Sequence, residues 1–69
     1  MDLQDIKNIL LAIQFADGDD EAQHSLEDKM LWDFVTHISK GVDDSPIELS
    51  IMASEILKSK DIKFCRWCA

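Results

Sequence analysis

Cys65 and Cys68 are the residues of this sequence whose spacing most resembles a chemical motif. They form a C-x-x-C pair inside the six-residue ending FCRWCA, and zinc ribbons and thiol redox proteins use this spacing. A structural zinc site needs four ligands. The other conventional nitrogen or sulfur ligands are His24 and His37, thirteen residues apart and far upstream. Two chains in a dimer would supply four thiolates, so a small cysteine-based metal-binding module is one alternative for this protein.

A redox role for the two cysteines has less support than a structural one. Thioredoxin-like motifs lie at a strand-to-helix junction within a βαβ unit, and the pattern around Cys65 and Cys68 predicts no such unit. We therefore interpret both as reduced, small apolar groups beside Phe64 and Trp67. We assign no metal ligand and no cofactor-binding residue.

No other group of residues predicts catalysis. No serine or cysteine has a base placed near it by spacing, and there is no glycine-rich phosphate loop. We interpret His37 as a hydrogen-bonded residue at the edge of the core. The acidic residues 17–21 lack the glycine and distal glutamate of a calcium-binding EF-hand loop, and we interpret them as solvated acids near a helix N-terminus. We predict that the protein is not an enzyme.

Large amphipathic side chains are the candidates for binding a protein partner. Tryptophan and arginine dominate measured interface hot spots, because they bury a large area and keep a polar group. Trp32 lies between charged residues and outside the expected apolar stripe, and Arg66 and Trp67 stand in the ending. The alternative for Trp67 is that it covers its own core. We interpret the ending as a docking or dimer-sealing segment, and Trp32, Arg66 and Trp67 as partner-binding residues.

Apolar positions recur at helical spacing through most of the chain, which predicts an all-α fold with a small bundle of about three helices. We expect helices at about residues 2–16, 20–40 and 45–60 and a tail at 61–69, within a single domain of residues 1–69. The residues expected to form the buried stripes are Leu3, Ile6, Ile9, Leu10, Ile13, Leu26, Met30, Leu31, Phe34, Val35, Ile38, Leu49, Met52, Ala53, Ile56 and Leu57.

Turn and capping residues support these helices. Gly18 is suited to end the first helix, because glycine readily adopts the positive φ of a helix C-cap. Asp20 with Gln23 resembles a capping box at the start of the second helix, and Ser45 followed by Pro46 marks the start of the third. The ending IKFCRWC alternates weakly, which leaves a short strand, an extended tail and a further helical turn open.

Two pairs of apolar residues stand off the expected stripes. Leu11 and Phe15 are one turn apart on the first helix, and Ile47 and Ile51 are one turn apart on the third. A small chain with surplus apolar surface generally covers it by self-association or by binding a partner. We predict a homodimer with these four residues in its interface, because two-fold dimers are the commonest soluble assemblies.

Composition and charge restrict the partners. The chain has 69 residues, a hydrophobic fraction of 46% and a net charge of −7. This charge disfavours direct binding to nucleic acid or to anionic membranes and suits a partner with a basic surface. No apolar run reaches the length of a membrane span. The acidic N-terminus is unlike a signal peptide, so we expect a cytoplasmic protein.

Over its whole length the sequence resembles the small anti-activators of quorum sensing encoded by Mu-like phages of Pseudomonas. The features shared are the length of 69 residues, the acidity, and the plan from MDLQDIKNILLAIQF to the ending KFCRWCA. The resemblance implies a homodimer that binds the DNA-binding domain of a LuxR-type transcription activator and keeps it off DNA. It also implies inhibition of a type IV pilus assembly ATPase. The alternative is an intracellular adaptor or regulator with another protein partner.

Overall fold

The computed structural model describes residues 1–41 and 43–66. These residues form three α-helices and one short 3₁₀-helix, α1 (Leu3–Phe15), α2 (Asp20–Ser39), α3 (Pro46–Leu57) and η1 (Lys58–Asp61). No β-strand occurs within this part of the chain. The prediction of an all-α bundle of about three helices is therefore confirmed.

Side chains cap the start of each of the three α-helices. Asp2 and Asp5 form a reciprocal capping box at α1, in which the Asp5 amide donates to Asp2 Oδ1 at 2.8 Å and the Asp2 amide donates to Asp5 Oδ2 at 3.0 Å. The N-cap of α2 is Asp19, one residue earlier than the expected Asp20. Ser45 caps α3 as expected. The helix starts therefore follow from local hydrogen bonds that satisfy otherwise free amides.

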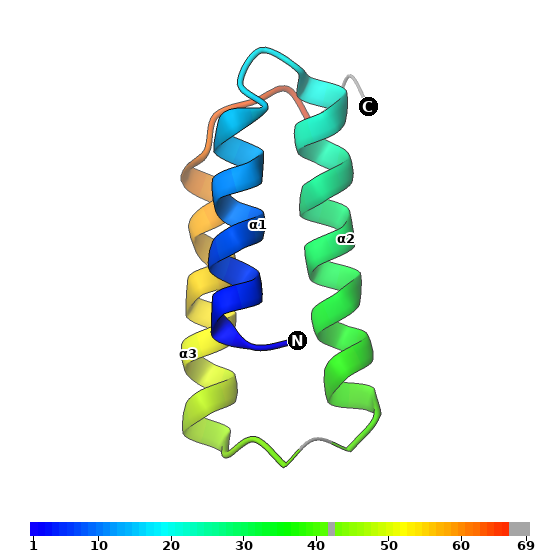
Figure 1. Ribbon diagram of the computed structural model, residues 1–69, viewed down its shortest axis with the longest axis vertical. Helices are drawn as coiled ribbons and strands as arrows, with labels where there is room; N and C mark the ends of the chain where they lie inside the picture. The colour runs from blue at the N-terminus through cyan, green and yellow to red at the C-terminus, as the bar shows by residue number, and fades with distance from the viewer. Residues whose placement is uncertain (42, 67–69) are drawn as a thin grey trace.

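The three helices form an elongated up-down-up bundle (Figure 1). Helices α1 and α3 run parallel to each other, and α2 runs in the opposite direction. Helix α1 packs against both α2 and α3. The Cα atoms span 37 × 17 × 15 Å. The bundle therefore has long sides, each formed by two neighbouring helices.

The buried core is small and is drawn from all three helices. Its residues are Ile6, Leu10, Ile13, Met30, Met52 and Ile56. Leu3 and Ile9 pack against it from the same helix as the first three, so the stripe predicted for residues 2–16 is confirmed. Burial of such side chains contributes roughly 1.5–3 kcal/mol each and is the main stabilising term of the fold.

The stripe predicted for the second helix is wrong in part. Met30 is fully buried, but Leu31, Val35 and Ile38 are exposed. On α3, Leu57 is likewise exposed although it was expected in the stripe. The reason is geometric, because a helix of a three-helix bundle buries only a limited arc of its circumference and these residues lie beyond that arc.

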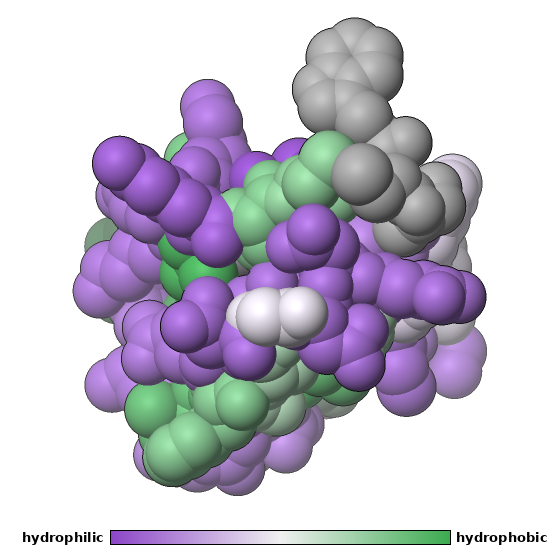
Figure 2. Space-filling view, turned by 90° about the horizontal axis from the view of Figure 1, so that it is seen from above, coloured by the Kyte–Doolittle hydropathy of each residue, from purple (hydrophilic) through white to green (hydrophobic). Residues whose placement is uncertain are grey.

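The C-terminal segment crosses one end of the bundle. Helix α3 gives way to η1 at Lys58, near the expected end at residue 60. Residues 62–66 then run without helix or strand from the end of α3 to the start of α2 (Figure 1). Viewed onto this end, the surface is mostly hydrophilic, with hydrophobic atoms gathered in separate areas (Figure 2). Of the three alternatives for the ending, an extended segment describes residues 62–66.

Candidate protein-interaction surface

Exposed apolar residues form a continuous stripe on α2. Leu31, Val35 and Ile38 follow one another at helical spacing, and Trp32 stands beside them. All four are exposed, and Trp32 is the most open with 69% of its surface accessible. We call these four residues the α2 face. A contiguous exposed apolar patch on a small domain is typical of a protein-binding surface.

The α2 face points away from α1. Asp33, Thr36 and His37 line a groove between α2 and α1. The core residue Met30 lies between that groove and the apolar stripe around the circumference of the helix. No element of the described chain therefore needs to move for a partner to reach the α2 face.

Charged and polar groups surround Trp32. Lys29 Nζ lies 2.7 Å from Asp33 Oδ2, and His24 Nε2 lies 3.4 Å from Asp28 Oδ2, each across one helical turn. Both carboxylates are partly exposed. The arrangement presents a large apolar ring with acidic groups at its edge. Such a surface matches a partner that offers an apolar pocket within a basic surround.

Arg66, the second candidate anchor, binds α2 and η1 through its guanidinium group. Its Nε donates to Glu27 Oε1 at 2.9 Å and its Nη2 donates to Glu27 Oε2 at 2.8 Å, so the ion pair is bidentate. Nη2 also donates to the carbonyl oxygens of Ser59 at 2.9 Å and Ile62 at 3.4 Å. The guanidinium stacks 3.9 Å from the centre of the Phe64 ring. These contacts join the C-terminal segment to α2 and η1.

Burial makes the carboxylate of this pair dependent on Arg66. The Glu27 side chain is only 11% exposed, whereas the Arg66 side chain is 35% exposed. The hydrogen bond from Arg66 holds the pKa of Glu27 below its usual value of 4.5, against the opposing effect of burial, and a hydrogen bond with Ser59 also lowers it. The geometry gives Arg66 a structural role, and a role in partner binding stays a prediction.

The structure describes only one of the three other residues singled out in the ending, namely Cys65. Trp67 and Cys68 lie outside the described residues. Cys65 is half-buried. Among residues 1–41 and 43–66, no group of three or more histidine, cysteine or acidic side chains is placed to hold a metal ion. In the same part of the chain, no helix is both long and apolar enough to span a membrane.

The residues predicted for a dimer interface are all on the surface. Leu11 and Phe15 are exposed on α1, and Ile47 and Ile51 are exposed on α3. Phe15 is 87% exposed, an unusual state for a phenylalanine in a monomer. Because α1 and α3 are parallel, the α1 pair lies near one end of the bundle and the α3 pair near the other. The structure therefore separates the two pairs within one chain.

His37 is a hydrogen-bonded residue at the edge of the core, as predicted. It is partly buried, and its Nε2 lies 2.7 Å from Asp44 Oδ2. Its Nδ1 lies 3.3 Å from the amino group of Met1. These contacts connect the end of α2 with the loop before α3 and with the start of the chain.

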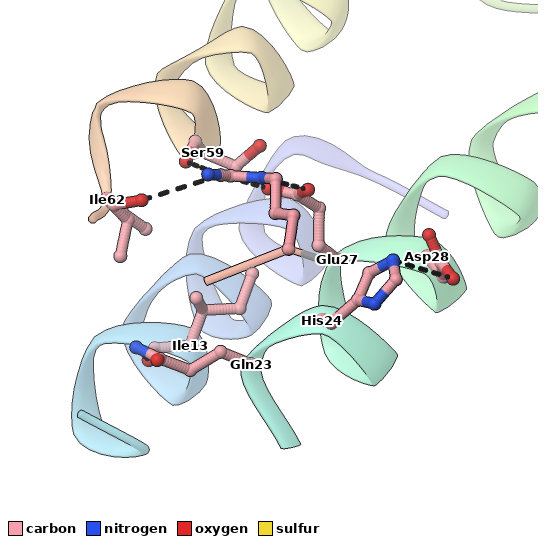
Figure 3. A network of polar contacts seen from close by, with 8 residues as sticks. Ile13, Gln23, His24, Glu27, Asp28, Ser59 and Ile62 are labelled. Atoms are coloured by element: carbon pink, nitrogen blue, oxygen red, sulfur yellow. Dashed lines mark hydrogen bonds and ion pairs between the residues drawn. The ribbon is translucent and has the colours of Figure 1, made fainter. Parts of the chain in front are cut away.

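Three buried polar residues, Gln23, Glu27 and Ser59, make contacts that were not expected from the sequence. The capping box expected from Asp20 and Gln23 is wrong, because Asp19 is the N-cap of α2 and the Gln23 side chain binds α1 instead. Gln23 is fully buried and its Nε2 donates to the Ile13 carbonyl oxygen at 2.9 Å, which serves a carbonyl in the last turn of α1 (Figure 3). The only available signal was that Glu27 occupies an inward position in the apolar pattern of the second helix, where a carboxylate needs a partner.

Comparison with known proteins identifies no relative of this chain. No family model, no curated protein and no solved structure matches the chain. The functional conclusion therefore rests on the geometry and charge of the surfaces described above.

Proposed function

We propose that this protein is a stoichiometric inhibitor that binds the DNA-contacting surface of a transcription activator and keeps the activator off DNA. The observation that carries the proposal is the α2 face, on which Trp32 stands exposed among acidic side chains. DNA-contacting surfaces are basic because they neutralise phosphates. An acidic protein with an apolar anchor is complementary to such a surface.

In the proposed complex, charge affects the rate of association, and apolar contacts determine selectivity. The net charge of −7 accelerates the encounter with a basic surface, but it attracts any basic protein. Selectivity requires groups that lose water on binding, and a central tryptophan is a frequent hot spot of this kind. Rising salt is expected to weaken the complex only in part, because salt screens charges and leaves buried apolar contacts in place.

The finer form of the proposal follows the resemblance described for the sequence. The target is the DNA-binding domain of a LuxR-type activator in the host cytoplasm, the active species is a homodimer, and a type IV pilus assembly ATPase is a further target. The −7 charge is compatible with the activator but does not single it out. An adaptor or regulator with a different basic partner uses the same face and is the competing proposal.

A gel-shift titration tests the proposal. Adding the folded protein to a LuxR-type activator and its operator should abolish the shifted band in proportion to the amount added. Trp32→Ala should weaken the inhibition roughly tenfold or more, since truncation of a hot-spot tryptophan commonly costs 2 kcal/mol or more. The control is Trp32→Phe, which keeps an aromatic anchor and should retain part of the inhibition. Circular dichroism should show the same helicity for all three proteins.

One outcome rejects the activator as the target. If the shifted band survives a molar excess of folded protein, the competing adaptor proposal takes its place. If inhibition occurs but Trp32→Ala inhibits as well as the unsubstituted protein, the α2 face is not the binding surface.

A further inference from the structure

The long side formed by α1 and α3 carries apolar residues at both ends. Leu11 and Phe15 lie near the C-terminal end of α1, and Ile47 and Ile51 lie near the N-terminal end of α3. Leu11 lines a groove between the two helices at one end, and Ile51 lines a second groove between them at the other end. We call this side the α1/α3 face. It is distinct from the α2 face.

Charges on the α1/α3 face are segregated between its two ends. The groove beside Leu11 is lined by Lys7 and Lys58 and by one acid, Glu55, which lies 2.8 Å from Lys58 Nζ. The charged residues that line the groove beside Ile51 are all acidic, namely Asp2, Asp44 and Glu48. One end of the face is therefore net basic and the other is strongly acidic, although the chain as a whole is acidic.

We propose that a second copy of this chain covers the α1/α3 face, with its helices antiparallel to those of the first copy. A two-fold axis perpendicular to α1 and α3 at the middle of the face exchanges its two ends. Leu11 and Phe15 of each copy then lie at the same end of the interface as Ile47 and Ile51 of the other, on diagonally placed helices. The same rotation sets the basic end of each copy against the acidic end of its partner.

The opposite orientation is electrostatically unfavourable. In a parallel dimer, the end with Asp2, Asp44 and Glu48 would meet its own copy, and like charges in contact cost free energy. Two chains that each carry a charge of −7 already repel each other. The antiparallel arrangement is the one in which local charge pairing opposes that repulsion.

The size of the face is adequate for a stable dimer. The bundle measures 37 Å in length and 15–17 Å across between Cα atoms. With side chains added, one long side is comparable with the roughly 800 Å² that each partner contributes to an interface of standard size. Phe15, with 87% of its surface accessible, supplies an aromatic side chain of the type that dominates interface energetics.

This arrangement deepens the homodimer of the proposed function, and purified protein tests it without any activator. Sedimentation equilibrium of the full chain should give twice the mass of the 7.9 kDa chain at micromolar concentration. Leu11→Gln should raise the dimer dissociation constant at least tenfold. The matched control is Val35→Gln on the α2 face, because the two residues are 50% and 54% exposed; it should change the constant less than threefold.

A photo-crosslink tests the orientation. We would replace Phe15 by p-benzoylphenylalanine, irradiate the dimer and identify the linked peptide by mass spectrometry. The antiparallel dimer should yield a covalent dimer linked from position 15 to the segment 45–54. A crosslinked species with twice the mass of one chain would show that the link joins two copies.

Other results overturn the proposal. A single-chain mass throughout the micromolar range would show that a second copy does not cover the face and would leave it to a different partner. A link from position 15 to the same end of α1 would indicate a parallel dimer, and a link to α2 would indicate a different face. Loss of dimerisation by Val35→Gln but not by Leu11→Gln would assign the dimer to the α2 face. None of these results depends on whether the gel shift is inhibited.

Discussion

Two positions on α2, Glu27 and Trp32, differ sharply in their surroundings although they lie only five residues apart. Glu27 is buried and bound at both carboxylate oxygens by Arg66 from the C-terminal segment. Trp32 is exposed, and its side chain projects from a helix whose nearby charges pair with one another. Trp32 and Arg66 were both expected to anchor a partner. In the folded chain the Arg66 side chain is bound to Glu27, whereas the Trp32 side chain is exposed.

The difference shows how to separate a residue whose side chain is engaged inside the fold from one that is accessible to a partner. A partner that bound the Arg66 guanidinium would have to compete with Glu27 and with the carbonyl groups of Ser59 and Ile62. Displacing it would leave the buried Glu27 carboxylate uncompensated, which is costly. A partner that covered Trp32 would break no contact of this kind. Burial and internal hydrogen bonding, more than residue type, distinguish the two.

The largest expected effect comes from removing the internal pair. Arg66→Ala should lower the free energy of unfolding by about 2 kcal/mol; breaking a fully buried pair costs 3–5 kcal/mol, and partial exposure of Arg66 reduces this. For a domain of this size the melting temperature should fall by roughly 10 °C. Thermal and urea unfolding at a fixed protein concentration would measure the change.

The matched variant is Arg66→Lys, which keeps the positive charge but loses the bidentate geometry. The free energy of unfolding of Arg66→Lys should lie between those of the unsubstituted protein and Arg66→Ala. Equal stability of Arg66→Ala and the unsubstituted protein would show that the contact with Glu27 adds nothing to the fold.

An intermediate effect is expected from acid. The pKa of Glu27 is lowered in the folded protein, so the stability from its pair with Arg66 is fully present above about pH 4.5 and is lost as the pH falls through the folded-state value. In Arg66→Ala, the buried carboxylate has lost the guanidinium, and its protonation in acid relieves part of the cost. The stability gap between the two proteins should therefore shrink on going from pH 6 to pH 3.

Urea unfolding of both proteins at several pH values would measure this gap. The difference between the two curves removes the contribution of the other carboxylates, which titrate in both proteins. A gap that stays constant or widens toward acid would contradict the assignment of Glu27 as the linked group.

The smallest effect on stability is expected on the α2 face. Trp32→Ala should change the free energy of unfolding by no more than about 0.5 kcal/mol, because exposed side chains away from buried contacts rarely matter more. The same substitution should have a large effect on partner binding. Urea unfolding would measure the change in the free energy of unfolding. A loss of stability as large as that of Arg66→Ala would show that Trp32 stabilises the fold and would contradict its assignment as a partner-binding residue.

The sequence by itself determined the parts of the fold that depend on local chemistry. Asp2, Ser45 and Pro46 define helix starts through hydrogen bonds and backbone preferences that reach only a few residues. The stripe of α1 could be predicted because Ile6, Leu10 and Ile13 repeat at helical spacing. The acidity of the chain and the apolar character of its candidate surface residues are also evident from the sequence.

Only the tertiary structure decided which predicted surface residues are free and which are engaged. Glu27 and Arg66 are 39 residues apart, and no local pattern connects side chains at that separation. The exposure of Leu31 and Val35 depends on where α1 and α3 stand around α2, since periodicity reveals an apolar stripe but not how much of it the neighbouring helices cover. Local chemistry acts over one or two turns of chain, whereas burial and pairing are set by the packing of elements distant in sequence.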